Sequence, residues 1–202
     1  MFTGIIKELG TVWAVARGRG IVRLRVHAPQ TAARLAVGDS VAMNGVCLSI
    51  VRIHQGALEF EMVPETRRLT NLGSLSSGAR VNVEPSLTLG DRLNGHIVLG
   101  HVDGVGRIVR SSKKAGDVVI GIRVDEALRC YLVPKAPIAV DGVSLTVGAR
   151  LTSTSFSVFL IPETIRQTTL GFRRVGDLVN IELDYFAKLV AQCTRVKFAS
   201  RN

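Results

Sequence analysis

Short runs of alternating apolar and polar residues recur along the chain, and glycine and polar turns separate them. In residues 21–26, for example, Val22, Leu24 and Val26 alternate with Arg23 and Arg25. A period of two, with many β-branched residues, predicts β-strands. The runs with this character span residues 21–26, 40–51, 57–63, 80–84, 118–124, 137–148, 155–161 and 177–183. Turns at intervals of roughly 8–15 residues are typical of an all-β sandwich or barrel.

Two Pro-Glu-Thr segments, at residues 64–66 and 162–164, interrupt the strand pattern. Proline suits the first turn of a helix, where its missing N–H has no intrahelical acceptor, and an acid there interacts favourably with the helix dipole. We therefore predict one short helix between the later strands of each half.

The last segment has the periodicity of a helix. Its apolar residues recur every three or four positions, with polar and basic residues between them: Phe186, Leu189, Val190, Cys193 and Val196. This spacing predicts an amphipathic helix with one apolar stripe. The stripe is suited either to packing back onto the second half of the chain or to association with its copies in an oligomer.

The chain repeats itself at an offset of 97 to 98 residues. Three pairs of segments match in the same order: 64–73 with 162–171, identical at seven of ten positions, 44–49 with 141–146, and 78–84 with 176–182. The repeat is longer than a solenoid unit and has the size of a small domain. We predict an all-β protein of two tandem six-stranded closed β-barrels, at residues 1–94 and 95–184, and a C-terminal helix at residues 185–202.

Composition and charge add few constraints on function. The 202 residues are 47% hydrophobic but only 5% aromatic, which predicts aliphatic cores, and the formal net charge is +10. The basic residues are scattered and no aromatic residues are interleaved with them. We therefore attribute the positive charge to a role in solubility and expect no nucleic-acid partner. Three cysteines and four histidines without ligand spacing predict no metal site and no disulfide framework.

The sequence also shows no targeting or membrane pattern. The first residues lack a basic start followed by an apolar run, and no stretch approaches the roughly 18 apolar residues of a membrane-spanning helix. We therefore expect no membrane partner and a cytoplasmic location, where free thiols stay reduced.

Small polar residues share one face of corresponding strands in the two halves. Cys47 and Ser49 alternate with apolar neighbours, and Ser144 and Thr146 take the matching positions. Such a row is either solvent-facing or the floor of a shallow site that offers thiol and hydroxyl groups to a ligand. Taken singly, Cys47 is more typical of a small inert side chain, and His101 is either a turn histidine or a general base.

In combination, the motifs resemble those of the riboflavin synthase family, α chain, over about residues 1–186. They are the opening residues 1–6, the strand at 44–49, both Pro-Glu-Thr segments, Gly95–Gly104 with its Gly-His motif, and residues 141–147. The resemblance implies an enzyme that moves a four-carbon unit between two molecules of 6,7-dimethyl-8-ribityllumazine, giving riboflavin and 5-amino-6-ribitylaminouracil. It implies one lumazine per barrel and no metal or redox cofactor. It also implies a homotrimer whose site joins the N-terminal barrel of one subunit to the C-terminal barrel of another.

The resemblance also implies the site residues. The first pocket would contain Phe2, Thr3, Gly4, Ser40, Cys47, Ser49, Glu65 and Thr66. The second would contain Lys135, Asp141, Ser144, Thr146, Ile161 and Thr164, with His101 of the Gly-His motif and Asp184 after the last strand. Its catalytic candidates are Cys47, His101, Lys135, Asp141 and Ser144. We expect His101 and Ser144 to handle protons in the second pocket, and Cys47 to have a polar or nucleophilic role in the first.

Two other classes of protein remain as alternatives. A non-catalytic lumazine- or flavin-binding relative would keep the first pocket and lose the second, and would be monomeric. A basic β-barrel that binds nucleic acid would show tight, salt-sensitive binding to oligonucleotides.

Overall fold

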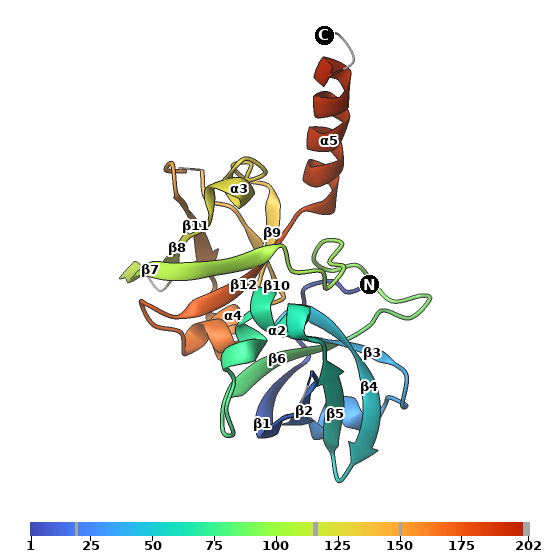
Figure 1. Ribbon diagram of the computed structural model, residues 1–202. Helices are drawn as coiled ribbons and strands as arrows, with labels where there is room; N and C mark the ends of the chain where they lie inside the picture. The colour runs from blue at the N-terminus through green and yellow to red at the C-terminus, as the bar shows by residue number, and fades with distance from the viewer. Residues whose placement is uncertain (19, 115–116, 150, 200–202) are drawn as a thin grey trace.

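The computed structural model describes residues 1–18, 20–114, 117–149 and 151–199. These residues form two six-stranded antiparallel sheets, one from each half of the chain, and a long C-terminal helix that stands away from both (Figure 1). The predicted tandem arrangement of two β units and a terminal helix is confirmed.

The first half is a closed barrel with the strand order β1-β2-β5-β4-β3-β6. Its elements are β1 (Glu8–Arg17), β2 (Val22–His27), α1 (Pro29–Ala32), β3 (Ser40–Met43), β4 (Val46–His54), β5 (Ala57–Met62), α2 (Pro64–Leu69), the 3₁₀ helix η1 (Asn71–Ser74) and β6 (Arg80–Pro85). Alternate residues fill the interior, as in β2, where Val22, Leu24 and Val26 are buried and the two arginines point outward. The predicted closed barrel is confirmed for this half.

The second half is a six-stranded sheet with the order β10-β9-β12-β7-β8-β11. Its elements are β7 (Gly104–Lys114), β8 (Asp117–Arg123), α3 (Glu126–Arg129), β9 (Pro137–Val140), β10 (Val143–Thr146), β11 (Ser155–Leu160), α4 (Pro162–Gln167), the 3₁₀ helix η2 (Thr169–Gly171) and β12 (Leu178–Leu183). Across the described residues, β10 and β11 form no ladder with each other. The predicted second six-stranded unit is confirmed, while a β10–β11 ladder that would close it into a barrel is not observed among the described residues.

The difference in closure arises at one hairpin. In the first half, β4 runs for nine residues into a two-residue turn, Gln55–Gly56, with φ values of 51° and 72°. Such turns match the twist of paired strands. In the second half, β10 has four residues and a longer connection follows, in which the Thr152 hydroxyl bonds to Ser155. Without a two-residue turn, β10 and β11 form no ladder, and a backbone hydrogen bond from the Gly148 amide to the Ser157 carbonyl, at 2.7 Å, joins the two edges.

Two of the predicted runs are hairpins rather than single strands. Residues 40–51 turn at Asn44–Gly45, with φ values of 45° and 78°, and residues 137–148 turn at Asp141–Gly142, with φ values of 47° and 76°. Positive φ at both central positions is the type I′ geometry that Asn-Gly and Asp-Gly favour.

The runs predicted from the sequence omit β1 and β7. Each of these strands contains an irregularity, at residues 12–14 in β1 and 108–110 in β7, where its pairing register shifts. A bulge of this kind displaces later side chains from the alternating pattern, which explains the omission.

The short helices α2 and α4 begin at the two predicted prolines, and both predictions are confirmed. The C-terminal helix α5 (Tyr185–Ala199) projects from the molecule instead of covering the second sheet (Figure 1). Phe186 and Val190 are 57% and 65% exposed. The side chain of Val196 lies outside the described residues. Within the described part of the chain, packing of the stripe back onto the second half is thus excluded.

None of the helices among the described residues is both long enough and apolar enough to span a membrane.

Candidate functional site

The opening segments of the two halves cross, so that each packs on the other half. Phe2 and Val98 pair in an antiparallel bridge, with N···O distances of 2.7 and 3.1 Å. Beyond this bridge, Ile6 packs against the core of the second half and Val102 against the core of the first. The surface of each sheet is therefore completed by residues that belong, in the repeat, to the other half.

The crossing brings each segment against the outward face of a hairpin. The amide of Cys47 in β4 donates to the carbonyl of Gly100 at 2.9 Å, and the amide of Ser144 in β10 donates to the carbonyl of Gly4 at 2.8 Å. Both glycines have positive φ, and a Cβ there would lie within 2.6 Å of the Ser144 or Cys47 side chain. Only glycine allows this approach, and the same arrangement is built twice.

Buried carboxylates hold both segments in place. Glu84 accepts the amides of Thr3 and Gly4 at 2.7 and 3.0 Å, and Glu182 holds the matching amides of the second segment at the same two distances. Burial raises the pKa of both carboxyls, and the N–H donors oppose the rise. Sequence reasoning missed this pair, although the two glutamates end the repeated segments 78–84 and 176–182.

A hollow of about 450 Å³ lies on the second half, between the N-terminal segment, β10 and α4. Its lining is Gly4, Ile5, Ile6, Lys7, Val143, Ser144, Ile161, Glu163, Thr164, Gln167 and Thr168. Its size suits a small-molecule ligand, and its apolar walls carry hydroxyl and amide groups that can orient one. Of the predicted site residues, Gly4, Ser144, Ile161 and Thr164 meet here.

The corresponding surface of the first half is centred on Cys47. This residue is half-buried and its neighbours in β4 are buried, so the small polar residues do share the outward face, as predicted. Ser49 lies on that face directly opposite Ser40 in the β3–β4 register. Thr66 lies in α2 at the position that Thr164 occupies in α4.

The crossing places two predicted residues against the half opposite to the one expected. Gly4 was predicted in the first pocket together with Thr3, and it lines the hollow of the second half, whereas Thr3 lines a hollow beside α1 and β6 of the first half. His101 was predicted beside Ser144, but it is exposed and follows Gly100, which is bonded to Cys47 of the first half. The repeat aligns each segment with its own half, so sequence comparison gave no sign of the exchange.

Phe2 fills the seam between the halves. It is fully buried and packs with Ala42 of β3, Ala139 of β9 and Val98, and with the side chain of Cys47. Phe2 therefore supports the floor of the first surface and separates the two hairpins.

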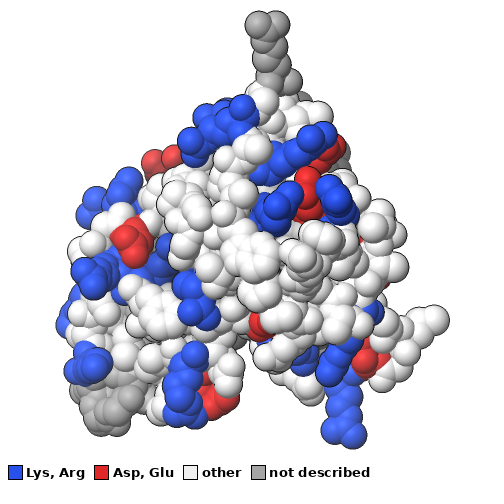
Figure 2. All heavy atoms as spheres, turned by 90° about the horizontal axis from the view of Figure 1, so that it is seen from below, with Lys and Arg blue, Asp and Glu red and all other residues white. Residues whose placement is uncertain are grey.

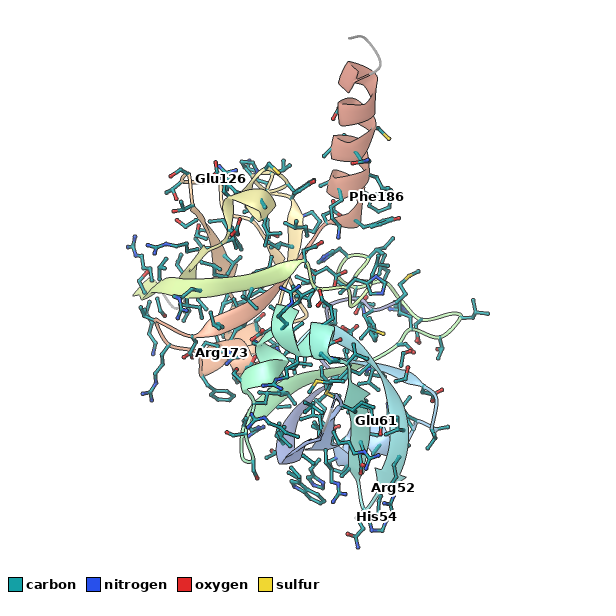
Figure 3. All side chains as sticks on the ribbon, in the orientation of Figure 1. Arg52, His54, Glu61, Glu126, Arg173 and Phe186 are labelled. Atoms are coloured by element: carbon teal, nitrogen blue, oxygen red, sulfur yellow. The ribbon has the colours of Figure 1, made fainter. Side chains whose placement is uncertain are left out.

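Asp141, which was predicted as a catalytic residue, does not line the hollow of the second half. It is fully buried at the β9–β10 turn and accepts bonds from Arg173 Nη2 at 2.7 Å, Asn71 Nδ2 at 2.7 Å and the Asn180 amide at 2.8 Å. Figure 3 shows Arg173 where the two halves meet. Burial raises the pKa of the Asp141 carboxyl, while Arg173 and the N–H donors oppose the rise. The structure gives this carboxylate a role in joining the halves.

Three other predicted residues lie around these surfaces. Lys135 is exposed at φ 67°, at the position where the first half has Gly38. Thr146 is exposed two residues beyond Ser144 on the same strand, and Glu65 is exposed in α2, paired with Arg68 at 2.7 Å.

Sequence reasoning missed His96 as a site residue. Its Nδ1 lies 2.6 Å from the Ser144 hydroxyl, and Asp184, which begins the turn into α5, acts on it electrostatically. Burial lowers the pKa of His96, and Asp184 opposes this shift. The only sequence signal was its place in the Gly-His segment that opens the second repeat.

A separate hollow of about 510 Å³ lies between α1, the end of β6 and residues 91–94. Five ionisable side chains contribute to its lining: Lys7, Arg34, Glu84, Asp91 and Arg92. It is larger than the hollow beside Ser144, but its lining is more strongly charged, whereas the walls of the smaller hollow are apolar with a few hydroxyl and amide groups, as is usual for small-molecule sites.

On the face that Figure 2 displays, the distribution of charge differs from that of a nucleic-acid groove. Figure 2 shows Lys and Arg side chains in separate groups over the face that it displays, with acidic side chains between them. On the first barrel, Arg23 and Arg25 pair with Glu61 and Glu59 at 2.9 and 3.2 Å. A continuous basic stripe would be expected for a phosphate backbone.

Comparisons with known proteins agree with this doubled surface. The model of the lumazine binding domain family matches the chain twice, over residues 3–86 and 99–184. The structure of LumP in complex with 6,7-dimethyl-8-(1'-D-ribityl)lumazine superposes with a TM-score of 0.83 at 21% identity, over 91% of this chain and 99% of that one. At this identity the structural match shows a common fold.

Sequence relatives extend the match to nearly the whole chain. The riboflavin synthase of Mycobacterium tuberculosis is 42% identical over 199 residues, covering 96% of this chain and 98% of the relative. That of Bacillus subtilis is 37% identical over 188 residues, covering 93% and 87%. With both lumazine binding domains matched and relatives of this identity along nearly its full length, the chain belongs to the riboflavin synthase family.

Proposed function

We propose that each half of the chain binds one lumazine and that the working site forms between subunits. As a riboflavin synthase, the chain is an enzyme of riboflavin biosynthesis. It converts two molecules of 6,7-dimethyl-8-ribityllumazine into riboflavin and 5-amino-6-ribitylaminouracil by four-carbon transfer. The observation that carries the proposal is the doubled surface, with Cys47 beside Gly100 in one half and Ser144 beside Gly4 in the other. Two identical substrates require two similar surfaces.

The packing within one chain favours a site between subunits. The buried Phe2 and Val98 fill the space between Ala42 of one hairpin and Ala139 of the other. This filled seam supports a site in which the facing surface comes from another copy. The exposed stripe of α5 supplies a surface for association, and we propose a homotrimer held by this helix.

The residues of each surface then receive roles. In the first we assign Ser40, Cys47, Ser49, Glu65, Thr66 and His101, and in the second Gly4, Lys135, Ser144, Thr146, Ile161, Thr164 and Asp184. Thr3 and Asp141 hold the architecture through Glu84 and Arg173, and Phe2 supports the Cys47 floor. The functional units are residues 1–94, 95–184 and 185–202. We place the protein in the cytoplasm, where Cys47 would stay reduced.

Turnover with the substrate alone tests the function. Purified protein is mixed with 6,7-dimethyl-8-ribityllumazine, nothing else is added, and riboflavin is followed by absorbance. We expect steady turnover with one riboflavin formed per two lumazines consumed, because donor and acceptor are the same compound. Tight, fluorescent binding without product would favour the alternative of a non-catalytic lumazine-binding protein.

A mixing experiment tests the location of the site between subunits. Thr66→Trp and Thr164→Trp place a bulky ring at matching positions of the first and second surfaces, and each variant alone is expected to be inactive. After dissociation and reassembly at equal amounts, intersubunit sites that combine the two unblocked surfaces should restore about a quarter of the wild-type rate. A site within one chain predicts no recovery, and the double variant Thr66→Trp/Thr164→Trp serves as the matched inactive control.

A further inference from the structure

The second surface contains a hydrogen-bonded pair that joins the pocket to a histidine behind it. The Ser144 side chain lines the hollow, and its hydroxyl lies 2.6 Å from Nδ1 of His96. The imidazole is half-buried, and burial lowers its pKa, so the neutral ring predominates near neutral pH. A neutral imidazole nitrogen without a proton accepts a hydrogen bond, and here the Ser144 hydroxyl can donate it.

The backbone holds the histidine in this place. The amide of His96 donates to the carbonyl of Thr3 at 3.1 Å, which ties it to the crossing segment. A Cβ on Gly95 would lie 2.1 Å from that carbonyl oxygen and 3.0 Å from the Ser144 hydroxyl oxygen. The glycine before His96 therefore permits the close contact between this segment and Ser144.

The pair is absent from the matching positions of the first surface. Cys47 replaces Ser144 there, and Ser86 occupies the position of Asp184. Cys47 is held through its backbone amide by Gly100, as Ser144 is by Gly4, so the two backbones agree while the side chains differ. Two lumazines bound in similar surfaces would thus meet different acid–base groups.

We propose that the lumazine on the second surface is the one that loses a proton from its 7-methyl group, and that Ser144 and His96 receive this proton. The inference rests on the proposed function. The C–H bond of the methyl group breaks and its electron pair stays on the lumazine. The proton passes to the Ser144 oxygen while the Ser144 hydroxyl proton passes to Nδ1 of His96. Ser144 is the catalytic residue, and His96 is a positioning residue that receives the relayed proton.

Charges around the ring support the imidazolium that this step forms. Asp184 acts on His96 as a negative charge and stabilises its protonated form. The Ser144 hydroxyl, which lies against Nδ1, is uncharged. Burial holds the pKa of His96 below its ordinary value. The ring therefore becomes protonated, and so unable to accept the proton, only when the pH falls below the ordinary pKa of a histidine.

Proton exchange on one surface at a time tests the proposal. In the Thr66→Trp variant only the second surface is open to a lumazine. Exchange of the 7-methyl protons in D₂O is followed by NMR as the loss of their signal. Lumazine without enzyme gives the reference rate. His96→Asn, which keeps a hydrogen-bonding group near Nδ1 but cannot take a proton, should slow enzyme-dependent exchange about 100-fold. Its lumazine affinity, measured by fluorescence, should stay within about twofold, as expected for a proton-transfer role. The acid-side fall in the exchange rate should disappear with the histidine.

Matched variants separate the outcomes. His54→Asn changes a histidine at the far tip of the first barrel and should leave the rate and its pH profile unchanged (Figure 3). Equal exchange with and without His96 would overturn the relay. Exchange that persists in Thr164→Trp but not in Thr66→Trp would assign the proton loss to the first surface and overturn the proposal. A wild-type protein that exchanges the methyl protons but makes no riboflavin would refute the proposed function and leave the relay standing.

Discussion

Asp141→Ala is expected to lower the free energy of unfolding by about 3–5 kcal/mol, since removing one partner of a buried ion pair leaves the other charge uncompensated. The carboxylate is fully buried and bonded to Arg173, Asn71 and the amide of Asn180. Alanine at this turn would also have to adopt φ 47°, a conformation that aspartate and asparagine tolerate better. Urea unfolding followed by circular dichroism measures the change.

The repeat provides the matched control for this prediction. Asn44 occupies the same turn in the first half, and its Oδ1 accepts the amide of Asn82 at 2.8 Å, as Asp141 accepts that of Asn180. Asp141→Asn therefore keeps the turn and this acceptor, but it removes the charge opposite Arg173 and the two hydrogen bonds that Oδ2 accepts from the guanidinium. We expect it to cost about 1–3 kcal/mol, because the Arg173 side chain reaches solvent.

Activity measurements distinguish the structural role of Asp141 from a catalytic one. Under conditions where both variants are folded, Asp141→Asn should keep most of the wild-type turnover. An Asp141→Asn enzyme of normal stability and no turnover would contradict the structural role and restore the catalytic assignment made from the sequence.

The sequence predicted the elements that depend on local pattern. Alternation located most strands, the prolines located α2 and α4, and three- to four-residue spacing located α5. The repeat predicted two similar units because related sequences bury related faces. Closure of the second sheet depends instead on whether the connection between β10 and β11 contains a tight turn. The alternation of apolar and polar residues in the strands does not predict such a turn. The hairpin turns, by contrast, were readable in Asn44–Gly45 and Asp141–Gly142.

The candidate site was predicted unevenly for a related reason. Cys47, Ser144 and Thr164 were found because they keep their positions in the repeat. The exchange of the segments that contain Gly4 and Gly100 is a long-range contact, and no local pattern reports it. The exchange also brings His96 beside Ser144, whereas the sequence had paired Ser144 with His101.

Removal of residues 189–202 is expected to reduce riboflavin formation at least about 100-fold at micromolar enzyme, because two lumazines held face to face react far faster than two that must meet by diffusion. The truncated chain keeps Lys188, whose Nζ bonds Asp103 at 2.8 Å and fixes the start of α5. It loses Leu189 and Val190, which are exposed in the single chain. Sedimentation should show a monomer, while each half still binds lumazine.

Two variants decide whether the loss of activity comes from lost assembly. Fusing an unrelated trimeric coiled coil in place of residues 189–202 should recover a measurable part of the turnover, since it restores proximity without restoring the native helix. Lys188→Met keeps the helix but removes its bond to Asp103, and a comparable loss there would point to the helix start rather than to association. A truncated monomer with wild-type turnover would show that one chain contains the whole site, and the requirement for a second subunit would then be wrong.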